Sequence, residues 1–215
     1  MPRHVPTVLA VDTVSAASGV ALCLSNGAVF ARDLGPRGSH AEALLPVVLS
    51  LLEESTLGWE DIELLAAAEG PGSFTGVRVG VSFVLGVSDA RDIPAVGVGS
   101  LDILARGCYD ATGLKTGTYV IPSLDVRRGE VAMTRFRVRE EGHLSREMDD
   151  GLAAVSDPGP PPPSGTALAG DGAMSLWPDR EDYVRWPGTG AERAVAAARL
   201  AIEVHLAGNS RPPVP

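Results

Sequence analysis

The sequence predicts an α/β protein whose mixed sheets are flanked by helices and whose two halves follow one plan. Each half opens with an apolar run that ends in aspartate, at Thr7–Asp12 and again at Thr118–Asp125. A continuous apolar run of this length is typical of a buried central strand. Longer apolar segments with helical spacing follow in both halves, at Ser39–Glu54 and at Glu192–Leu206. The chain of 215 residues, 45% of them hydrophobic, can bury the core of one large or two small domains.

Three strands open the first half. The run Thr7–Asp12 is followed by apolar runs at Gly19–Leu24 and Ala28–Leu34, with Asn26-Gly27 between the last two. Asn-Gly between apolar runs is the strongest short hairpin signal, because both residues tolerate positive φ. We therefore expect an antiparallel meander.

A helix is expected next, over Ser39–Glu54. Ser39 and Glu42 have the S-x-x-E spacing of a capping box, which satisfies free N–H groups at a helix start. Pro46 lies inside this helix and should kink it, because proline lacks the N–H that bonds to the preceding turn. The first half then continues with a strand at Leu64–Glu69, a helix at Phe74–Ala90, a strand at Pro94–Val98 and a helix from Ser100.

The second half repeats this pattern weakly. Val11-Asp12 in the first half and Leu124-Asp125 in the second are each followed by a short run that begins with glycine. This duplication suits two tandem ribonuclease-H-like halves, and we assign a first domain to residues 1–105 and a second, shortened domain to 106–215. The remaining expected elements are strands at Gly129–Phe136, Thr166–Gly170 and Asp182–Trp186, an exposed proline-rich loop at Asp157–Gly165 and the final helix at Glu192–Leu206.

The charge balance limits the possible functions. The net charge is −9, from 18 Lys+Arg against 27 Asp+Glu. Because non-specific affinity for nucleic acid comes from Lys and Arg, the chain is not expected to hold DNA or RNA alone. One basic cluster interrupts this acidic composition, and it consists of Arg127, Arg128, Arg135, Arg137 and Arg139. Such a cluster is more often the exposed face of a strand than a nucleic-acid site.

We expect a cytoplasmic protein without a membrane span, a metal or a cofactor. No run of about 18 apolar residues lacks a charge, and the N-terminal run Val8–Val11 is too short for a signal peptide. Cys23 and Cys108 lie far apart without CxxC spacing, which is typical of core cysteines in a reducing compartment. The histidines without metal-ligand spacing are His4, His40, His143 and His205.

The aspartates that end the two leading strands are candidates for chemistry. In actin-like ATPases and sugar kinases such a pair handles metal and phosphate, and a glycine stands two residues after the first aspartate. Val14 occupies that place here. Asp12, Thr13 and Asp125 are therefore either the remnant of a nucleotide site or residues that cap nearby backbone N–H groups.

A glycine-rich segment is the second candidate, at Gly70-Pro71-Gly72-Ser73-Phe74-Thr75-Gly76. Glycines before a helix leave backbone N–H groups free to meet an anion. The spacing is that of neither a Walker A loop nor a dinucleotide fingerprint. The other interpretation is a tight strand-to-helix turn that Ser73 caps.

The helices Ser39–Glu54 and Phe74–Ala90 carry more apolar surface than one core face requires. Apolar residues of the first cover about 200° of its circumference, whereas a core-facing helix needs a little over 100°. Each of the three glycines of the second costs about 1 kcal/mol relative to alanine, which indicates a close neighbour. Either both helices are sandwiched within their domain, or part of their surface binds another chain. The candidate interface residues are His40, Leu44, Val47, Val48, Leu51, Gly76, Val79, Gly80 and Phe83.

Several motifs occur in a family-specific order. The most specific is Gly70-Pro71-Gly72-Ser73-Phe74-Thr75-Gly76-Val77-Arg78-Val79-Gly80. The others are Leu9-Ala10-Val11-Asp12-Thr13, Ser39-His40 with Leu44-Leu45-Pro46, Gly97-Val98-Gly99-Ser100-Leu101 and Asp125-Val126-Arg127-Arg128-Gly129-Glu130-Val131. By these motifs the chain resembles the TsaB family, also called YeaZ, of the bacterial tRNA threonylcarbamoyladenosine pathway. The resemblance is strong over residues 8–131 and beyond them rests on Ala169-Gly170-Asp171-Gly172.

The resemblance implies an actin-like (ASKHA) fold of two ribonuclease-H-like halves and a scaffold subunit without catalytic residues of its own. Proteins of this family pair with the transferase TsaD through first-domain helices and recruit the ATPase TsaE. The assembly transfers a threonylcarbamoyl group to N6 of the adenosine beside the anticodon in tRNA. We therefore expect TsaD and TsaE as partners, contact with tRNA only through the complex, and a homodimer when the partners are absent.

Three features depart from the family pattern. Catalytic relatives carry a His-x-x-x-His metal pair on the first helix, whereas here Leu44 stands four residues after His40. A proline run replaces the helix expected before Thr166. The chain ends at Pro213-Val214-Pro215, where relatives usually have a Pro-x-Tyr-Leu-Arg segment, and this indicates a truncated or lost tail.

Two other functions stay open. One is an actin-fold ATPase or small-molecule kinase that uses Asp12, Asp125 and the glycine-rich segment, against which Val14 argues; we expect weak ATP binding or none. The other, with less support, is a peptidase-like protein, against which the missing second histidine argues.

Overall fold

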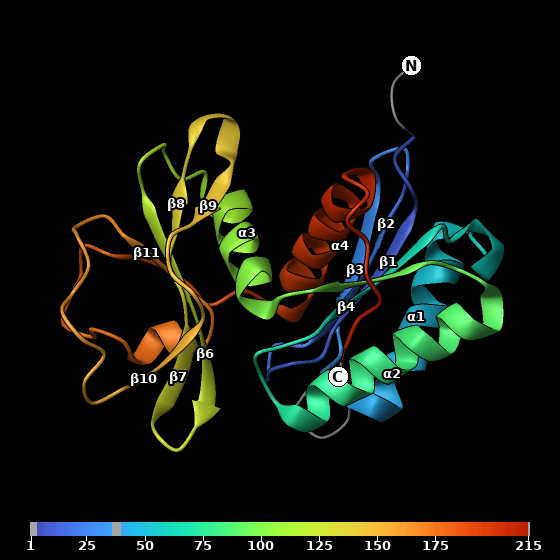
Figure 1. Ribbon diagram of the computed structural model, residues 1–215. Helices are drawn as coiled ribbons and strands as arrows, with labels where there is room; N and C mark the ends of the chain where they lie inside the picture. Colours follow the sequence, from blue (N-terminus) through green and yellow to red (C-terminus); the bar gives the residue numbers. More distant parts are fainter. Residues whose placement is uncertain (1–3, 36–39, 215) are drawn as a thin grey trace. The chain divides into compact units, whose positions relative to one another are not determined.

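The structure, a computed structural model, describes residues 4–35 and 40–214. Two compact units divide the chain, of which the first consists of Met1–Ile103 with Thr189–Pro215 and the second of Leu104–Gly188. Each unit is built on a sheet that contains parallel and antiparallel strand pairs (Figure 1). The predicted α/β class, with mixed sheets flanked by helices, is confirmed.

The first unit contains a five-stranded sheet in the order β3-β2-β1-β4-β5. β1 pairs antiparallel with β2, and β2 with β3, which confirms the predicted meander, whereas β1, β4 and β5 are parallel. Every residue of β1, β2 and β4 is buried, as their continuous apolar sequences require. The strands are β1 (Val8–Asp12), β2 (Gly19–Cys23), β3 (Val29–Asp33), β4 (Leu64–Ala68) and β5 (Ala95–Val98).

Helices cover both faces of this sheet (Figure 1). α1 (His40–Ser55) and α2 (Phe74–Arg91) lie on one face, and a short helix η1 (Trp59–Asp61) follows α1. α1 contains Pro46 in its interior, while Ser39 of the predicted capping box lies outside the described residues. α3 (Ser100–Thr112) begins in the first unit and ends in the second.

The C-terminal helix α4 (Gly190–Leu206) packs on the other face, mainly against β1 and β2. The sequence analysis placed these residues in a second domain of 106–215, whereas the structure places Thr189–Pro215 in the first unit. The reason is that β1 and β2 are buried on both faces, and the helices of the first half cover only one of them. The last segment of the chain therefore completes the core of the first unit.

The second unit contains a seven-stranded sheet. Its main path is β10-β7-β6-β11-β12, and β8 pairs with both β6 and β9. The elements are β6 (Tyr119–Arg127), β7 (Glu130–Met133), β8 (Phe136–Val138), β9 (Leu144–Arg146), β10 (Gly151–Ala154), β11 (Ala167–Ala169) and β12 (Val184–Trp186), with short helices η2 (Glu140–Gly142) and η3 (Gly172–Ser175).

The strand predicted at Gly129–Phe136 is divided into β7 and β8. Both strands pair with β6. β7 pairs with the second half of β6, and β8 pairs with the start of β6, at Tyr119 and Val120. Between them Thr134 is buried, and its hydroxyl donates to the carbonyl of Met148 at 2.5 Å. The chain thus shifts along β6 at Thr134, a step that an alternating sequence does not reveal.

The proline-rich loop at 157–165 is held by aromatic side chains. The hydroxyl of Tyr183 donates to the carbonyl of Pro162 at 2.6 Å, and the indole N–H of Trp177 donates to the carbonyl of Gly159 at 3.2 Å. The loop is largely exposed, as predicted. Within the part of the chain that the structure describes, no helix combines the length and apolar character needed to cross a membrane.

Both cysteines are free and belong to the core. Cys23 lies on β2 and Cys108 on α3. Burial raises the pKa of the Cys23 thiol to about 11 and that of Cys108 to about 12. Because the thiolate is the reactive form, both groups stay protonated and inert near neutral pH.

We therefore expect neither thiol of the native protein to react with Ellman's reagent at pH 8. At that pH a thiol with a pKa of about 11 is thiolate in about one molecule in a thousand. In denaturing urea both thiols should react within minutes. Absorbance at the wavelength of the released thiolate measures both rates, and rapid reaction of either native thiol would contradict the burial described for it.

Candidate functional site

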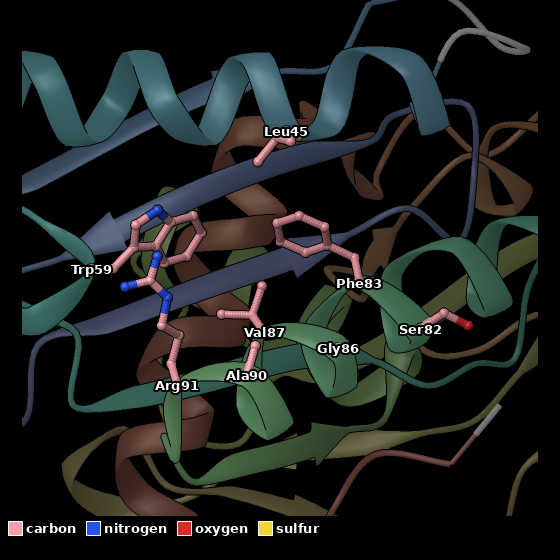
Figure 2. A pocket seen from close by; sticks show the side chains of 8 residues that line it. All are labelled: Leu45, Trp59, Ser82, Phe83, Gly86, Val87, Ala90 and Arg91. Carbon is pink, nitrogen blue, oxygen red and sulfur yellow. The ribbon is translucent and has the colours of Figure 1, made fainter.

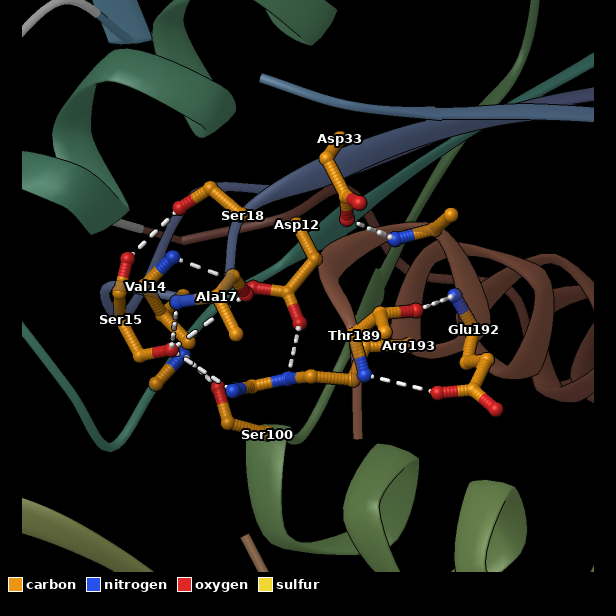
Figure 3. A network of polar contacts seen from close by, with 12 residues as sticks. Asp12, Val14, Ser15, Ala17, Ser18, Asp33, Ser100, Thr189, Glu192 and Arg193 are labelled. Atoms are coloured by element: carbon orange, nitrogen blue, oxygen red, sulfur yellow. Dashed lines mark hydrogen bonds and ion pairs between the residues drawn. The ribbon is translucent and has the colours of Figure 1, made fainter. Parts of the chain in front are cut away.

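The site at the end of β1 is built around a buried carboxylate. Asp12 is the last residue of β1 and is fully inaccessible to solvent. The backbone N–H of Val14 donates to its Oδ1 at 3.1 Å, and the Nε–H of Arg193 donates to its Oδ2 at 3.1 Å (Figure 3). Both oxygens of the carboxylate are therefore bonded to groups of the chain itself.

Arg193 comes from the first turn of α4 and is also fully buried. Its Nη1–H donates to Ser15 Oγ at 2.7 Å, whereas Nη2 is buried and has no hydrogen-bond partner among the described residues. Taking two charges out of water is costly, and the cost is offset only when the charges pair closely and their other polar atoms are bonded. Arg193 thus neutralises Asp12 in the interior of the first unit.

Two glycines allow α4 to approach so closely. A Cβ on Gly190 would overlap the backbone of Ser18, and a Cβ on Gly19 would overlap the backbone of Gly190. The helix begins in a capping box, in which Thr189 Oγ1 accepts from the N–H of Glu192 at 3.2 Å and a Glu192 carboxylate oxygen accepts from the N–H of Thr189 at 2.8 Å. The start of α4 is therefore fixed against the β1–β2 connection.

Sequence reasoning missed Arg193. The sequence analysis assigned no role to this arginine near the start of an alanine-rich helix. The signal that could have found it is helical spacing, since Arg193, Ala197 and Ala201 are four residues apart and all are buried. An arginine in register with an apolar stripe needs an acidic partner inside the protein.

The glycine-rich segment is a tight strand-to-helix turn. Ser73 caps α2 by accepting from the N–H of Gly76 at 3.3 Å, and its own N–H donates to the carbonyl of Val14 at 2.6 Å. The hydroxyl of Thr13 donates to the carbonyl of Gly76 at 2.7 Å. A Cβ on Gly72 would lie 2.6 Å from the oxygen of Val14. The segment holds the residues that follow Asp12, which favours the turn over the anion cradle.

Gly76 and Gly80 face this turn and not the protein surface. A Cβ on Gly76 would overlap the carbonyl oxygen of Thr13, and one on Gly80 would lie 2.5 Å from Thr13 Oγ1. The sequence analysis expected a close neighbour at these glycines and counted both among the candidate interface residues. In the structure the close neighbour is Thr13 of the same chain, directly after β1, and a larger residue at position 80 would displace it.

His40 lies in the same polar network. Its Nδ1 is 3.2 Å from Ser18 Oγ, whose own hydroxyl donates to the carbonyl of Ser15 at 2.7 Å. Ser18 must then accept from the Nδ1–H of His40, so the histidine positions the β1–β2 connection. Among the described residues, no group of three or more His, Cys, Asp or Glu side chains is arranged to hold a metal ion.

Asp125 lies in the second unit, near the end of β6, and is exposed. Its Oδ1 accepts from the N–H of Arg127 at 2.7 Å, and its own N–H donates to Asp171 Oδ1 at 3.2 Å. The carboxylate supports the turn between β6 and β7, where Arg127 and Arg128 have positive φ angles of 73° and 60°. Asp125 thus caps backbone groups, which is one of the two roles that the sequence left open for it.

The nine candidate interface residues differ in exposure. The buried ones are His40, Leu44, Val48, Leu51 and Gly80. The partly buried ones are Val47, Gly76, Val79 and Phe83. Leu45 and Leu49 belong to the predicted apolar arc of α1 but not to the nine candidates, and their exposed fractions are 47% each. The outward part of that arc therefore includes residues that the list of candidates omitted.

A groove opens beside this arc, between α1, η1 and α2. Its volume is about 450 Å³, and its lining is almost entirely apolar. Figure 2 shows Leu45, Trp59 and Phe83 around it, with Val87 and Arg91 further along α2. The guanidinium of Arg91 stacks over the indole ring of Trp59 at 5.8 Å from its centroid. The groove is thus an apolar surface with one charged edge.

Comparison with known proteins gives consistent matches. Over residues 37–202 the chain matches the family described as TsaD: tRNA N6-adenosine threonylcarbamoyltransferase. It is 38% identical over 136 residues to the tRNA threonylcarbamoyladenosine biosynthesis protein TsaB of Escherichia coli (strain K12), covering 63% of this chain and 57% of the relative. It is 34% identical over 151 residues to the Bacillus subtilis (strain 168) protein of that name, covering 70% and 63%. The chain thus spans about three fifths of the length of these relatives.

Solved structures agree with these matches. The chain resembles YeaZ from Pseudomonas aeruginosa with a TM-score of 0.79 at 26% identity, covering 98% of this chain and 99% of the other. It resembles the activator of 2-hydroxyisocaproyl-CoA dehydratase from Clostridium difficile with a TM-score of 0.54 at 9% identity, covering 94% and 96%. The second likeness concerns the fold alone. The predicted actin-like fold is confirmed.

Removing one partner of the Asp12–Arg193 pair should destabilise the first unit more than removing both charges. Arg193→Met leaves Asp12 buried without its counter-ion, which lowers the free energy of unfolding by about 3–5 kcal/mol. The double variant Asp12→Asn with Arg193→Met should lose less than the sum of the two single variants, because the residues are in contact. Urea denaturation followed by circular dichroism measures these differences.

Arg32→Met is the matched control for this series. Arg32 pairs with Glu54 at the surface, where the two side chains are 52% and 45% exposed, and such pairs contribute up to about 1 kcal/mol. Equal losses for Arg193→Met and Arg32→Met would contradict the structural role of the buried pair.

Calorimetric titration of the pure chain with magnesium and ATP should give no low-micromolar binding. Both oxygens of Asp12 are bonded within the protein, and Val14 is buried where a phosphate-binding glycine would stand. A known ATP-binding protein of the same fold serves as the positive control. A low-micromolar dissociation constant for the chain would restore the ATPase or kinase interpretation.

Proposed function

The chain belongs to the tRNA N6-adenosine threonylcarbamoyltransferase family, in its TsaB (YeaZ) branch, and from this premise we propose that it is a noncatalytic subunit of the tRNA-modifying assembly. In this proposal it pairs with a TsaD-type transferase, and a TsaE-type ATPase joins the pair. The assembly transfers a threonylcarbamoyl group to N6 of the adenosine beside the anticodon. The chain reaches tRNA only within that assembly.

One observation carries the noncatalytic role. Asp12, the carboxylate at the end of the leading strand, is buried and neutralised by Arg193 of the same chain. A kinase or ATPase needs this carboxylate open to metal or phosphate. A metal-dependent transferase or peptidase of the kind with a His-x-x-x-His pair needs a second histidine where Leu44 stands, and Leu44 is buried in the core.

The groove between α1 and α2 is where we place the transferase. The chain matches the transferase family over most of its length, so the partner is expected to present a similar pair of helices. Leu45 lines the groove, and Leu49 of the same helix supplies further exposed apolar surface. An apolar helix pair would exclude water from this surface. In the absence of the transferase the same groove would pair with a second copy of this chain.

Leu45→Glu should weaken binding to the transferase at least tenfold, because a carboxylate without a partner would be buried in an apolar interface. Co-purification and titration by biolayer interferometry measure the affinity. Sedimentation of the chain alone should show a shift from dimer to monomer. Leu152→Glu is the matched control, since Leu152 is 67% exposed on β10 of the second unit and lies far along the chain from the groove.

The modification itself tests the function. Formation of threonylcarbamoyladenosine in tRNA, followed by mass spectrometry in a reaction with the transferase and the ATPase, should require the wild-type chain. Leu45→Glu should reduce the product and Leu152→Glu should not. Equal product with and without the chain would refute the proposed function, and unchanged binding by a folded Leu45→Glu variant would refute the docking surface.

A further inference from the structure

A row of arginines lies on one face of β8. Phe136 and Val138 of this strand are buried, and the residues that alternate with them are Arg135, Arg137 and Arg139. Because side chains in a strand alternate between faces, the three arginines lie on the opposite face from the core, about 7 Å apart in succession. The strand therefore presents a linear series of cations.

An aromatic ring completes this row. Tyr119 of β6 is the register partner of Arg137 and lies on the same face. The guanidinium groups of Arg135 and Arg137 each lie 5.3 Å from the centroid of its ring. Stacking on one ring holds the two cations in defined positions, although their charges repel. We call Tyr119, Arg135, Arg137 and Arg139 the β8 basic face.

The charges of the β8 basic face are only partly compensated. Glu147 lies 3.6 Å from Arg135 Nε and 3.1 Å from Arg139 Nη2, so one carboxylate serves two arginines. Arg137 has no ion pair among the residues that the structure describes. Lys115, the one lysine of the sequence, is exposed in the turn beside β8, where the N–H of Gly117 donates to the carbonyl of Val138 at 2.8 Å.

A cavity of about 460 Å³ adjoins the β8 basic face. Thr116, Arg137, Arg139 and His143 line it, and Glu140 is the acidic residue among its lining. Its volume is that of a small-ligand site. The cavity thus has guanidinium groups that suit a phosphate, and one carboxylate that would disfavour it.

We propose that the β8 basic face and its cavity bind the phosphate backbone of RNA, and that this face is the chain's own contribution to tRNA binding by the assembly. The inference rests on the proposed function for the identity of the RNA. A track of cations beside an aromatic ring is how proteins hold nucleic-acid strands without reading sequence. The chain as a whole carries a net charge of −9, so most of its surface repels the phosphates of RNA. The β8 basic face is a local exception at which the RNA backbone can bind.

The test is the salt dependence of tRNA binding. Fluorescence anisotropy is measured for labelled tRNA with the chain–transferase complex, and with the chain alone at low salt. Arg137→Gln should weaken binding and lower the slope of log affinity against log salt by about 0.7, the value for one lost contact to a single strand. Arg180→Gln is the matched control, because Arg180 is in the same unit but forms two hydrogen bonds of 2.8 Å with Asp182.

Each outcome bears on the proposal. A lower affinity and slope for Arg137→Gln, with Arg180→Gln like wild type, supports it. Unchanged affinity and slope for Arg137→Gln overturns the proposal. Binding of an acidic peptide at this face, without binding of RNA, would also overturn it. Inorganic phosphate and ATP are added as competitors; if they bind at the face while tRNA binding is unaffected by Arg137→Gln, the site holds a small anion and the RNA assignment fails. Formation of the complex is followed separately by size-exclusion chromatography, so failure to pair with the transferase refutes the proposed function without affecting the measurement on the chain alone.

Discussion

The ion pair between Asp12 and Arg193 joins the two ends of the chain. The residues are 181 positions apart, and both are completely buried in the first unit. A charge in the interior is stable only when its partner is held in place, so this pair requires α4 to start at one position above the end of β1. The close glycine contacts at Gly19 and Gly190 and the capping box at Thr189 serve the same placement.

The placement of α4 explains why the first unit is not a continuous segment. The sheet formed by the first half is apolar on both faces, and α1 and α2 cover one of them (Figure 1). α4 covers the other with a stripe of alanines whose small side chains let the helix lie close to the strands. The core of the first unit is therefore complete only when the last helix has been added.

The pair of Asp12 and Arg193 also determines which parts of the first unit stay accessible to a ligand or a partner. The polar centre at Asp12 is closed by the chain's own arginine, and the glycine-rich turn is committed to holding Thr13 and Val14. What stays open in the first unit is the apolar groove between α1 and α2, and in the second unit the β8 basic face. A closed centre and two open surfaces of different chemistry are what a subunit that binds partners requires.

The sequence by itself determined the local elements and their type. The apolar runs of β1 and β2, the Asn26-Gly27 hairpin and the cap of α2 at Ser73 follow from periodicity and turn chemistry, which depend on neighbours a few residues away. The surplus apolar surface of α1 was also predictable, though not its exact direction. Only the tertiary structure decided which distant groups meet: that Arg193 lies against Asp12, and that Gly76 and Gly80 face Thr13. Helical spacing restricts the face on which a residue lies, but the element that packs against that face is chosen by the topology of the whole chain.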